Sequence, residues 1–104
     1  MAESASVSAP LCLIVLTYVG SLDEVDARLP AHVAWLRQGY EQGLFLVAGR
    51  RTPRVGGIIV ARGEREAVEQ FAATDPFVTS GVATAEVIAF TATSAAPTIA
   101  DLLG

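Results

Sequence analysis

The segment Leu11–Val19 is apolar or β-branched at both odd and even positions. Because successive side chains of a strand point to opposite faces of a sheet, this run predicts a strand that is buried on both of its faces. A chain of 104 residues forms one domain with a modest core, so few folds can cover both faces of such a strand. Both faces of the sheet that contains this strand must therefore be buried by other parts of the fold or by a partner.

Two segments show the period of a helix. The first extends from Asp23 to about Gln42 and begins with acidic residues, and Glu64–Ala73 repeats the period. A proline in a helix interior removes a backbone hydrogen bond, so Pro30 predicts that the regular part of the first helix begins nearer Leu29. The apolar stripe of this helix consists of Val25, Leu29, Val33, Leu36 and Tyr40.

Three further segments have the composition of strands, namely Leu44–Gly49, Val55–Ala61 and Ala83–Thr93. The charged stretch Arg50–Arg54 separates the first two and predicts an exposed hairpin tip. The resulting order of strand, helix, strand, strand, helix, strand predicts an α+β, ferredoxin-like fold. In that fold two helices lie on one face of a four-stranded antiparallel sheet.

The helices of such a fold cover only one face of the sheet. Since the strands predicted at 11–19, 44–49 and 83–93 are apolar on both faces, the uncovered face would expose a large apolar patch. Packing against a second copy of the chain, sheet to sheet, removes that patch from water. We therefore predict a homodimer.

The ends of the chain differ in composition from the middle. Residues 1–10 are small and mostly polar and are predicted to form a disordered leader, residues 11–93 form the domain, and residues 94–104 form a C-terminal tail. Within this tail, Thr98–Leu103 either docks as one helical turn or packs on a neighbouring molecule.

Charge and cysteine content exclude several classes of partner. A net charge of -4 with only 7 Lys and Arg argues against nucleic acid. The apolar run Leu11–Val19 is too short to span a bilayer and follows no basic residue, so we expect a cytoplasmic protein with no membrane partner. The single cysteine, Cys12, is predicted to be a buried small hydrophobe. With one histidine, one cysteine and no clustered acids, a transition-metal site would need ligands from both subunits, so we expect none, and no cofactor.

The residues most suited to chemistry are His32 and Asp75. His32 is the only histidine and falls at the margin of the first helix's apolar stripe, where a general base is partly desolvated yet accessible. If Asp75 reaches one ring nitrogen, it fixes the tautomer and stabilises the imidazolium. On the same helix, Arg28 would hold an anionic oxygen and Trp35 would stack on a ring.

Each of these residues also has a purely structural interpretation. His32 would be a half-buried histidine with satisfied hydrogen bonds, and Asp75 would be the N-cap of a helix that begins with Pro76. Arg28 would be a solvated helix charge and Trp35 a core residue.

An ordered set of short motifs resembles a known family. These motifs are Arg28-x-x-x-His32-x-x-Trp35-Leu36, Gly43-Leu44, Ala48-Gly49, Gly56-Gly57, Asp75-Pro76-Phe77 and Gly81. Together, over residues 11–90, they resemble the YciI-like (YCII-related) proteins of the dimeric α/β barrel group.

The resemblance implies a sheet-to-sheet dimer, a pocket between helices and sheet, and an active site at His32 and Asp75. A member of the family is a dehydrochlorinase of a hydroxylated, chlorinated aromatic ring. Arg50 and Ile88-Ala89-Phe90 stand where a proline and a tryptophan are common in the family. Both differences fall near the pocket that the resemblance implies, so the substrate does not transfer to this chain.

Two classes of function are therefore expected. The first is a cofactor-independent lyase or isomerase that uses a His-Asp pair for general acid/base chemistry on a small aromatic or enol substrate. The alternative is a non-catalytic small-molecule-binding or accessory protein of the same fold. A cofactor-free oxygenase is a weaker option that rests on analogy of fold alone.

Overall fold

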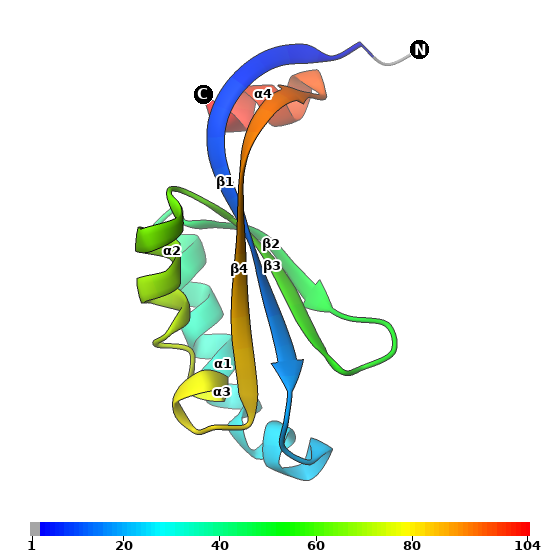
Figure 1. The fold of residues 1–104 in the computed structure, drawn as a ribbon, viewed down its shortest axis with the longest axis vertical. Helices are drawn as coiled ribbons and strands as arrows, with labels where there is room; N and C mark the ends of the chain where they lie inside the picture. Colours follow the sequence, from blue (N-terminus) through cyan, green and yellow to red (C-terminus); the bar gives the residue numbers. More distant parts are fainter. Residues whose placement is uncertain (1–2) are drawn as a thin grey trace.

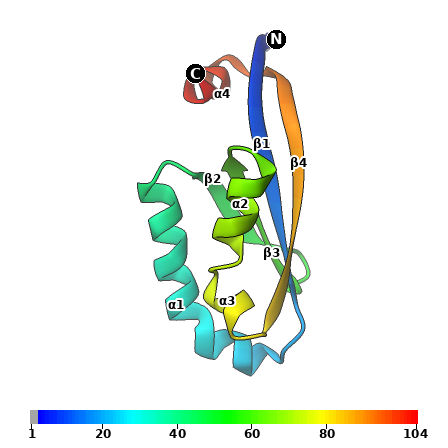
Figure 2. The ribbon, with the colours of Figure 1, turned by 60° about the vertical axis from the view of Figure 1, so that its left-hand side comes forward.

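The computed structural model describes residues 3–104. In chain order the elements are β1 (Ala5–Tyr18), α1 (Leu22–Glu41), β2 (Phe45–Arg50), β3 (Gly56–Arg62), α2 (Arg65–Ala72), α3 (Pro76–Thr79), β4 (Ala83–Ala95) and α4 (Pro97–Leu103). The strands form one four-stranded antiparallel sheet in the order β2-β3-β1-β4. Helices α1, α2 and α3 cover one face of it (Figures 1 and 2). The predicted ferredoxin-like α+β fold is confirmed, with α3 as an additional short helix.

The core lies between the sheet and these three helices. Alternate residues of β1, namely Cys12, Ile14 and Leu16, point to the helix side and are buried, because the side chains of a strand alternate between faces. Cys12 is fully buried, as predicted, and this burial raises the pKa of its thiol. From the helices, the core receives Val25, Trp35, Val68 and Phe77, among other side chains.

The N-terminal part of β1 extends beyond the body of the sheet. Residues 5–6 and 9–10 pair with β4, with an irregularity between them, and Ala5 lies opposite Ala95, whereas pairing with β3 begins at Leu11. The prediction of a disordered leader is therefore wrong for residues 5–10, because their backbone groups find partners at the far end of the chain. Residues 1–2 of that predicted leader lie outside the described residues.

The predicted tail also belongs to ordered elements. β4 continues to Ala95, and α4 packs against β1 and β4 of its own chain. The tail therefore docks on the same molecule as a short helix, and Figure 1 shows it beside the extended part of β1.

Helix α1 begins at Leu22, one residue before the predicted Asp23, and continues through Pro30, so the prediction that its regular part begins nearer Leu29 is wrong. Ser21 and Glu24 form a capping box, in which Glu24 N–H donates to Ser21 Oγ at 3.2 Å and Ser21 N–H donates to Glu24 Oε1 at 3.0 Å. The capping box stabilises the first turns, and Val25 is buried beneath them. Together these two contributions exceed the cost of the one backbone hydrogen bond that Pro30 cannot form.

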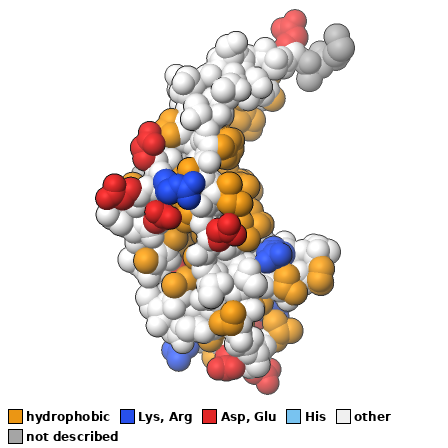
Figure 3. All heavy atoms as spheres, in the orientation of Figure 1, with side chains coloured by type: hydrophobic (Ala, Val, Ile, Leu, Met, Phe, Trp, Pro, Cys, Tyr) orange, Lys and Arg blue, Asp and Glu red, His pale blue; other side chains and the backbone are white. Residues whose placement is uncertain are grey.

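The sheet face without helices is largely apolar. Register places Leu13, Val15, Ile58, Val60, Val47, Ile88 and Phe90 on this face. Val47 is 56%, Ile88 44% and Phe90 45% exposed. Figure 3 shows hydrophobic side chains along this concave side of the molecule. We call this surface the open sheet face. Within residues 3–104, no helix is both long and apolar enough to cross a membrane.

Candidate active site

A cavity of about 280 Å³ lies between α1 and the β2–β3 hairpin. Most of its lining is apolar and comes from both layers of the fold. The apolar side chains include Leu16 and Ile59 from the sheet, Leu29, Val33 and Leu36 from α1, and Phe77 from α3. His32, Arg50, Tyr18 and Tyr40 are the polar side chains of the lining.

His32 and Asp75 form a direct contact at the wall of this cavity. His32 Nδ1 lies 2.8 Å from Asp75 Oδ1, although the two residues are 43 positions apart in the chain. His32 is 8% exposed and Asp75 is fully buried. The structure therefore brings together the two residues that the sequence singled out, and places the imidazole between the carboxylate and the cavity.

Local structure fixes the position of Asp75. It is the N-cap of α3, where its Oδ1 accepts a hydrogen bond from Phe77 N–H at 2.9 Å, and Pro76 occupies the first helical position. The same oxygen accepts the bond from His32. The structural and the chemical interpretation of Asp75 are thus compatible, because one carboxylate oxygen serves both partners.

Aromatic contacts hold the imidazole ring of His32. The ring stacks on Phe77 with centroids 4.0 Å apart and an interplanar angle of 10°, and Trp35 lies 5.6 Å away. Phe77 belongs to the helix that Asp75 caps, so a single short segment sets both the ring plane and the bond to Nδ1. The orientation of the imidazole is therefore determined by packing as well as by hydrogen bonding.

The second ring nitrogen of His32 remains accessible. Among residues 3–104, His32 Nε2 forms no hydrogen bond. The buried polar atoms without a partner in this range are Arg54 Nε, Arg62 Nε and Asp75 Oδ2. Nε2 is not among them, so it is not buried. Since Nδ1 donates to the carboxylate, the neutral tautomer carries its proton on Nδ1 and a lone pair on Nε2. The arrangement can accept a proton at Nε2.

The two predicted substrate contacts do not line the cavity. Arg28 is exposed on α1 and is absent from the lining. Trp35 is buried, donates from Nε1 to Thr74 Oγ1 at 2.9 Å and stacks on Phe71 with centroids 5.2 Å apart. Trp35 thus joins α1 to the segment that carries Asp75, in agreement with its interpretation as a core residue.

The family resemblance placed Arg50 near the presumed pocket, but the sequence did not single it out as a residue of the site. The predicted strand ended at Gly49, so Arg50 was assigned to the hairpin tip, whereas β2 includes Arg50. One signal was present: Arg50 follows Ala48 by two positions, and residues two apart in a strand share a face. Ala48 and Arg50 both line the cavity.

Two glycines shape the cavity floor. A Cβ at Gly56 would overlap the carbonyl oxygen of Leu16, so the close approach of β3 to β1 requires glycine at that position. Gly57 lies between Leu16 and Arg50 in register and leaves that one position of β3 without a side chain on the cavity side. In the described part of the chain, no group of three or more His, Cys, Asp and Glu side chains is placed to hold a metal ion.

Comparison with known proteins gives a family and a fold. The YCII-related domain family matches residues 11–91. Six chains of known structure also match. One is the 5-chloro-2-hydroxyhydroquinone dehydrochlorinase (TftG) from Burkholderia phenoliruptrix AC1100, in complex with 2,5-dihydroxybenzoquinone. The match has 23% identity, a TM-score of 0.64, and covers 75% of this chain and 90% of the neighbour, so it shows a shared fold. No curated protein matches the sequence.

Proposed function

Because this chain belongs to the family of YCII-related domains, we propose that its cavity is the active site of a lyase or isomerase that works without a cofactor. His32 is the general acid and base, and Asp75 orients it. The observation that supports this function most directly is the 2.8 Å contact between His32 Nδ1 and a fully buried carboxylate, next to a cavity that an organic molecule can enter.

The proposed reaction begins with proton transfer to His32. Nε2 accepts a proton from a carbon or a hydroxyl group of the substrate, and the imidazolium is stabilised by the negative charge of Asp75. The electron pair of the broken bond moves into the substrate. In an isomerisation the proton returns to another atom, and in an elimination a leaving group departs with its electron pair. General acid–base catalysis of this kind contributes about 10²–10⁴-fold in rate.

The cavity suits a substrate with a single ring. An apolar cavity of about 150 Å³ holds a benzene molecule, whereas this cavity has a volume of about 280 Å³, which leaves room for ring substituents. Its apolar walls would contact the faces of the ring. The structural neighbour named above is a dehydrochlorinase in complex with a dihydroxylated quinone. That ligand is a small cyclic enol, the class of substrate proposed for this cavity.

A non-catalytic binding protein is the second candidate. It is favoured by the small number of polar side chains in the lining, since beyond His32 and Arg50 only two tyrosines contribute polar groups. Such a protein would bind the same rings in the same cavity without transferring protons.

Exchange of ring protons with solvent distinguishes these two functions. With resorcinol and 2,5-dihydroxybenzoquinone as probes in D₂O, we expect the wild type to accelerate the loss of ring-proton signals in NMR spectra. His32→Asn should return exchange to the uncatalysed rate, and Asp75→Asn should lower it at least tenfold, because an amide does not supply the charge that stabilises the imidazolium.

The matched control is Gln38→Asn, an exposed change on the same helix, which should leave exchange unaltered. Binding of both probes with equal affinity to the wild type and His32→Asn, without accelerated exchange in either, would support the binding protein instead.

We also propose that two copies pack through the open sheet face. Exposed side chains such as Ile88 and Phe90 lie there beside half-buried residues of β1 and β3. Large exposed apolar patches are uncommon on monomers, and a two-fold contact between identical faces would cover this one.

A further inference from the structure

We infer that the cavity binds small ring compounds that carry an anionic group, and that Arg50 is the residue that binds this group. The inference rests on the proposed function, since it names the substrate class of the same cavity. It assigns the role of anion contact to Arg50 rather than to Arg28.

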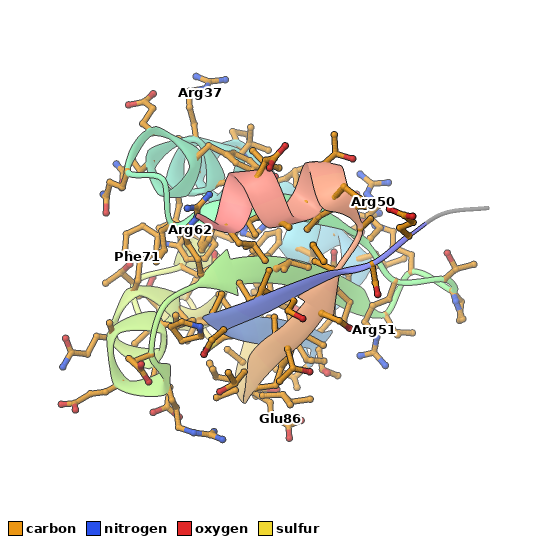
Figure 4. All side chains as sticks on the ribbon, turned by 90° about the horizontal axis from the view of Figure 1, so that it is seen from above. Arg37, Arg50, Arg51, Arg62, Phe71 and Glu86 are labelled. Carbon is orange, nitrogen blue, oxygen red and sulfur yellow. The ribbon has the colours of Figure 1, made fainter. Side chains whose placement is uncertain are left out.

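Strand register places the Arg50 side chain on the cavity side of the sheet. Arg50 lies opposite Gly57 of β3, and Gly57 lies opposite Leu16 of β1. Cross-strand partners share a face, and Leu16 is buried beneath the helices. Arg51 points the other way and donates to Thr17 Oγ1 at 3.1 Å. Figure 4 shows Arg50 and Arg51 leaving the hairpin on opposite sides.

The guanidinium of Arg50 is available for a ligand. Among residues 3–104, Arg50 forms neither an ion pair nor a side-chain hydrogen bond. Arg54 on the same hairpin is already occupied, because it pairs with Asp26 at 2.6 Å. Arginine presents a fixed fork of donors that matches a carboxylate or a pair of ring oxygens.

The charge of the lining favours an anion. No Asp or Glu lines the cavity, although the whole chain has 11 acidic residues against 7 Lys and Arg. Asp75 lies behind His32 and is bonded to it. The cavity therefore has a positive group at its wall in a protein of net negative charge. Arg50 is an exposed residue, so water partly screens its charge and we expect a modest preference for anions.

An anion contact at Arg50 also fits the proposed chemistry. When His32 removes a proton from a tetrahedral ring carbon next to a carbonyl group, as in the keto form of a cyclic enol, the electron pair moves toward the ring oxygen, which then carries more negative charge. A guanidinium beside that oxygen stabilises the charge as it develops. Arg50 would thus contribute to substrate selection and to the stability of the enolate that forms.

Benzoate and benzamide provide a direct test, because they have the same ring and similar size but differ in charge. We expect the wild type to bind benzoate about fivefold to tenfold more tightly than benzamide in isothermal titration. Arg50→Gln should abolish this preference and leave benzamide affinity unchanged, and Arg50→Lys should retain part of it. Arg28→Gln removes an arginine from α1 outside the cavity and should keep the full preference.

The opposite results would overturn the inference. These are equal affinity for both rings in the wild type, a preference that survives in Arg50→Gln, a preference lost in Arg28→Gln instead, or no binding of either ring to the wild type. Failure of the proposed function is measured separately. His32→Asn should lose proton exchange yet keep the preference for benzoate, so absent exchange in the wild type would not by itself remove the role of Arg50.

Discussion

At the scale of single residues, one carboxylate oxygen of Asp75 both caps helix α3 and binds His32. Its Oδ1 accepts from His32 and from Phe77 N–H, while its buried Oδ2 has no hydrogen bond among residues 3–104. The cap fixes the carboxylate before any ligand arrives. The imidazole is therefore already oriented for the proton transfer that we propose, without rearrangement of its partners.

Replacing Gly39 by alanine should lower the stability of the protein. A Cβ at this position of α1 would overlap the ring of Phe45, and that ring packs edge-on against both Trp35 and Phe71. Alanine gains about 1 kcal/mol in helix propensity, but overpacking costs about 1–3 kcal/mol. We therefore expect Gly39→Ala to destabilise the protein, as measured by urea unfolding.

The neighbouring exposed substitution Gln38→Ala is the control for Gly39→Ala. It should change the free energy of unfolding by no more than about 0.5 kcal/mol. A Gly39→Ala protein more stable than the wild type would show that the Phe45 ring moves aside at little cost.

At the scale of elements, the start of α1 determines how the helix carries His32 over the sheet. The capping box at Ser21 and Glu24 begins the helix well before Pro30. Without the capping box, Pro30 would occupy the first turn of a shorter helix, where proline is favoured. The turns that it adds bring Val25 into the core and place Asp26 where it pairs with Arg54 of the hairpin.

Loss of the cap should be measurable as lost stability. Ser21→Ala leaves Glu24 N–H without its side-chain acceptor and should lower the free energy of unfolding by about 1 kcal/mol. Thermal unfolding at neutral pH provides the measurement. An unchanged melting temperature would mean that water replaces the hydroxyl group at no cost.

The same cap makes stability depend on pH. The bond from Ser21 N–H, with a second from its hydroxyl, lowers the pKa of Glu24 in the folded state. Its contribution is therefore present above the ordinary pKa of a glutamate and is lost as the pH falls through the lowered value. The stability difference between wild type and Glu24→Gln should accordingly shrink in acid, and a difference that grew in acid would contradict this assignment.

At the scale of the whole molecule, the two sheet faces differ in how they are covered. Three helices bury one face, whereas the open sheet face lies in the concave side seen in Figure 3. The extended ends of β1 and β4 lengthen the molecule to 44 Å along its longest axis. Helix α4 lies at this end of the molecule, and two of its apolar side chains, Ile99 and Leu102, are 47% and 58% exposed.

The proposed dimer predicts the effect of a charge on the open sheet face. Light scattering after size-exclusion chromatography should give the wild type twice the mass of one chain. Phe90→Glu should give the mass of a single chain, because the carboxylate would be buried without a partner in the contact. Val19→Glu changes an exposed apolar residue in the turn between β1 and α1 and should remain dimeric. A monomeric wild type would exclude the sheet-to-sheet dimer.

Local patterns in the sequence predicted most of the fold. A period near four residues identified the two longer helices, and short runs of apolar and β-branched residues identified the strands, because both patterns reflect burial within one element. The same reasoning placed His32 at the edge of the apolar stripe, where the structure has it facing the cavity. Boundaries were less accurate, as the start of β1 at Ala5 rather than Leu11 shows.

Only the tertiary structure decided which residues meet. Residues 5–10 are a strand because their partner is the end of β4, and Arg50 rather than Arg28 lines the cavity because of how β2 pairs with β3. Such pairings join segments that are distant in the chain, and no local period encodes them. Composition and periodicity thus determined the elements and their buried faces, while long-range pairing determined the charge and shape of the cavity.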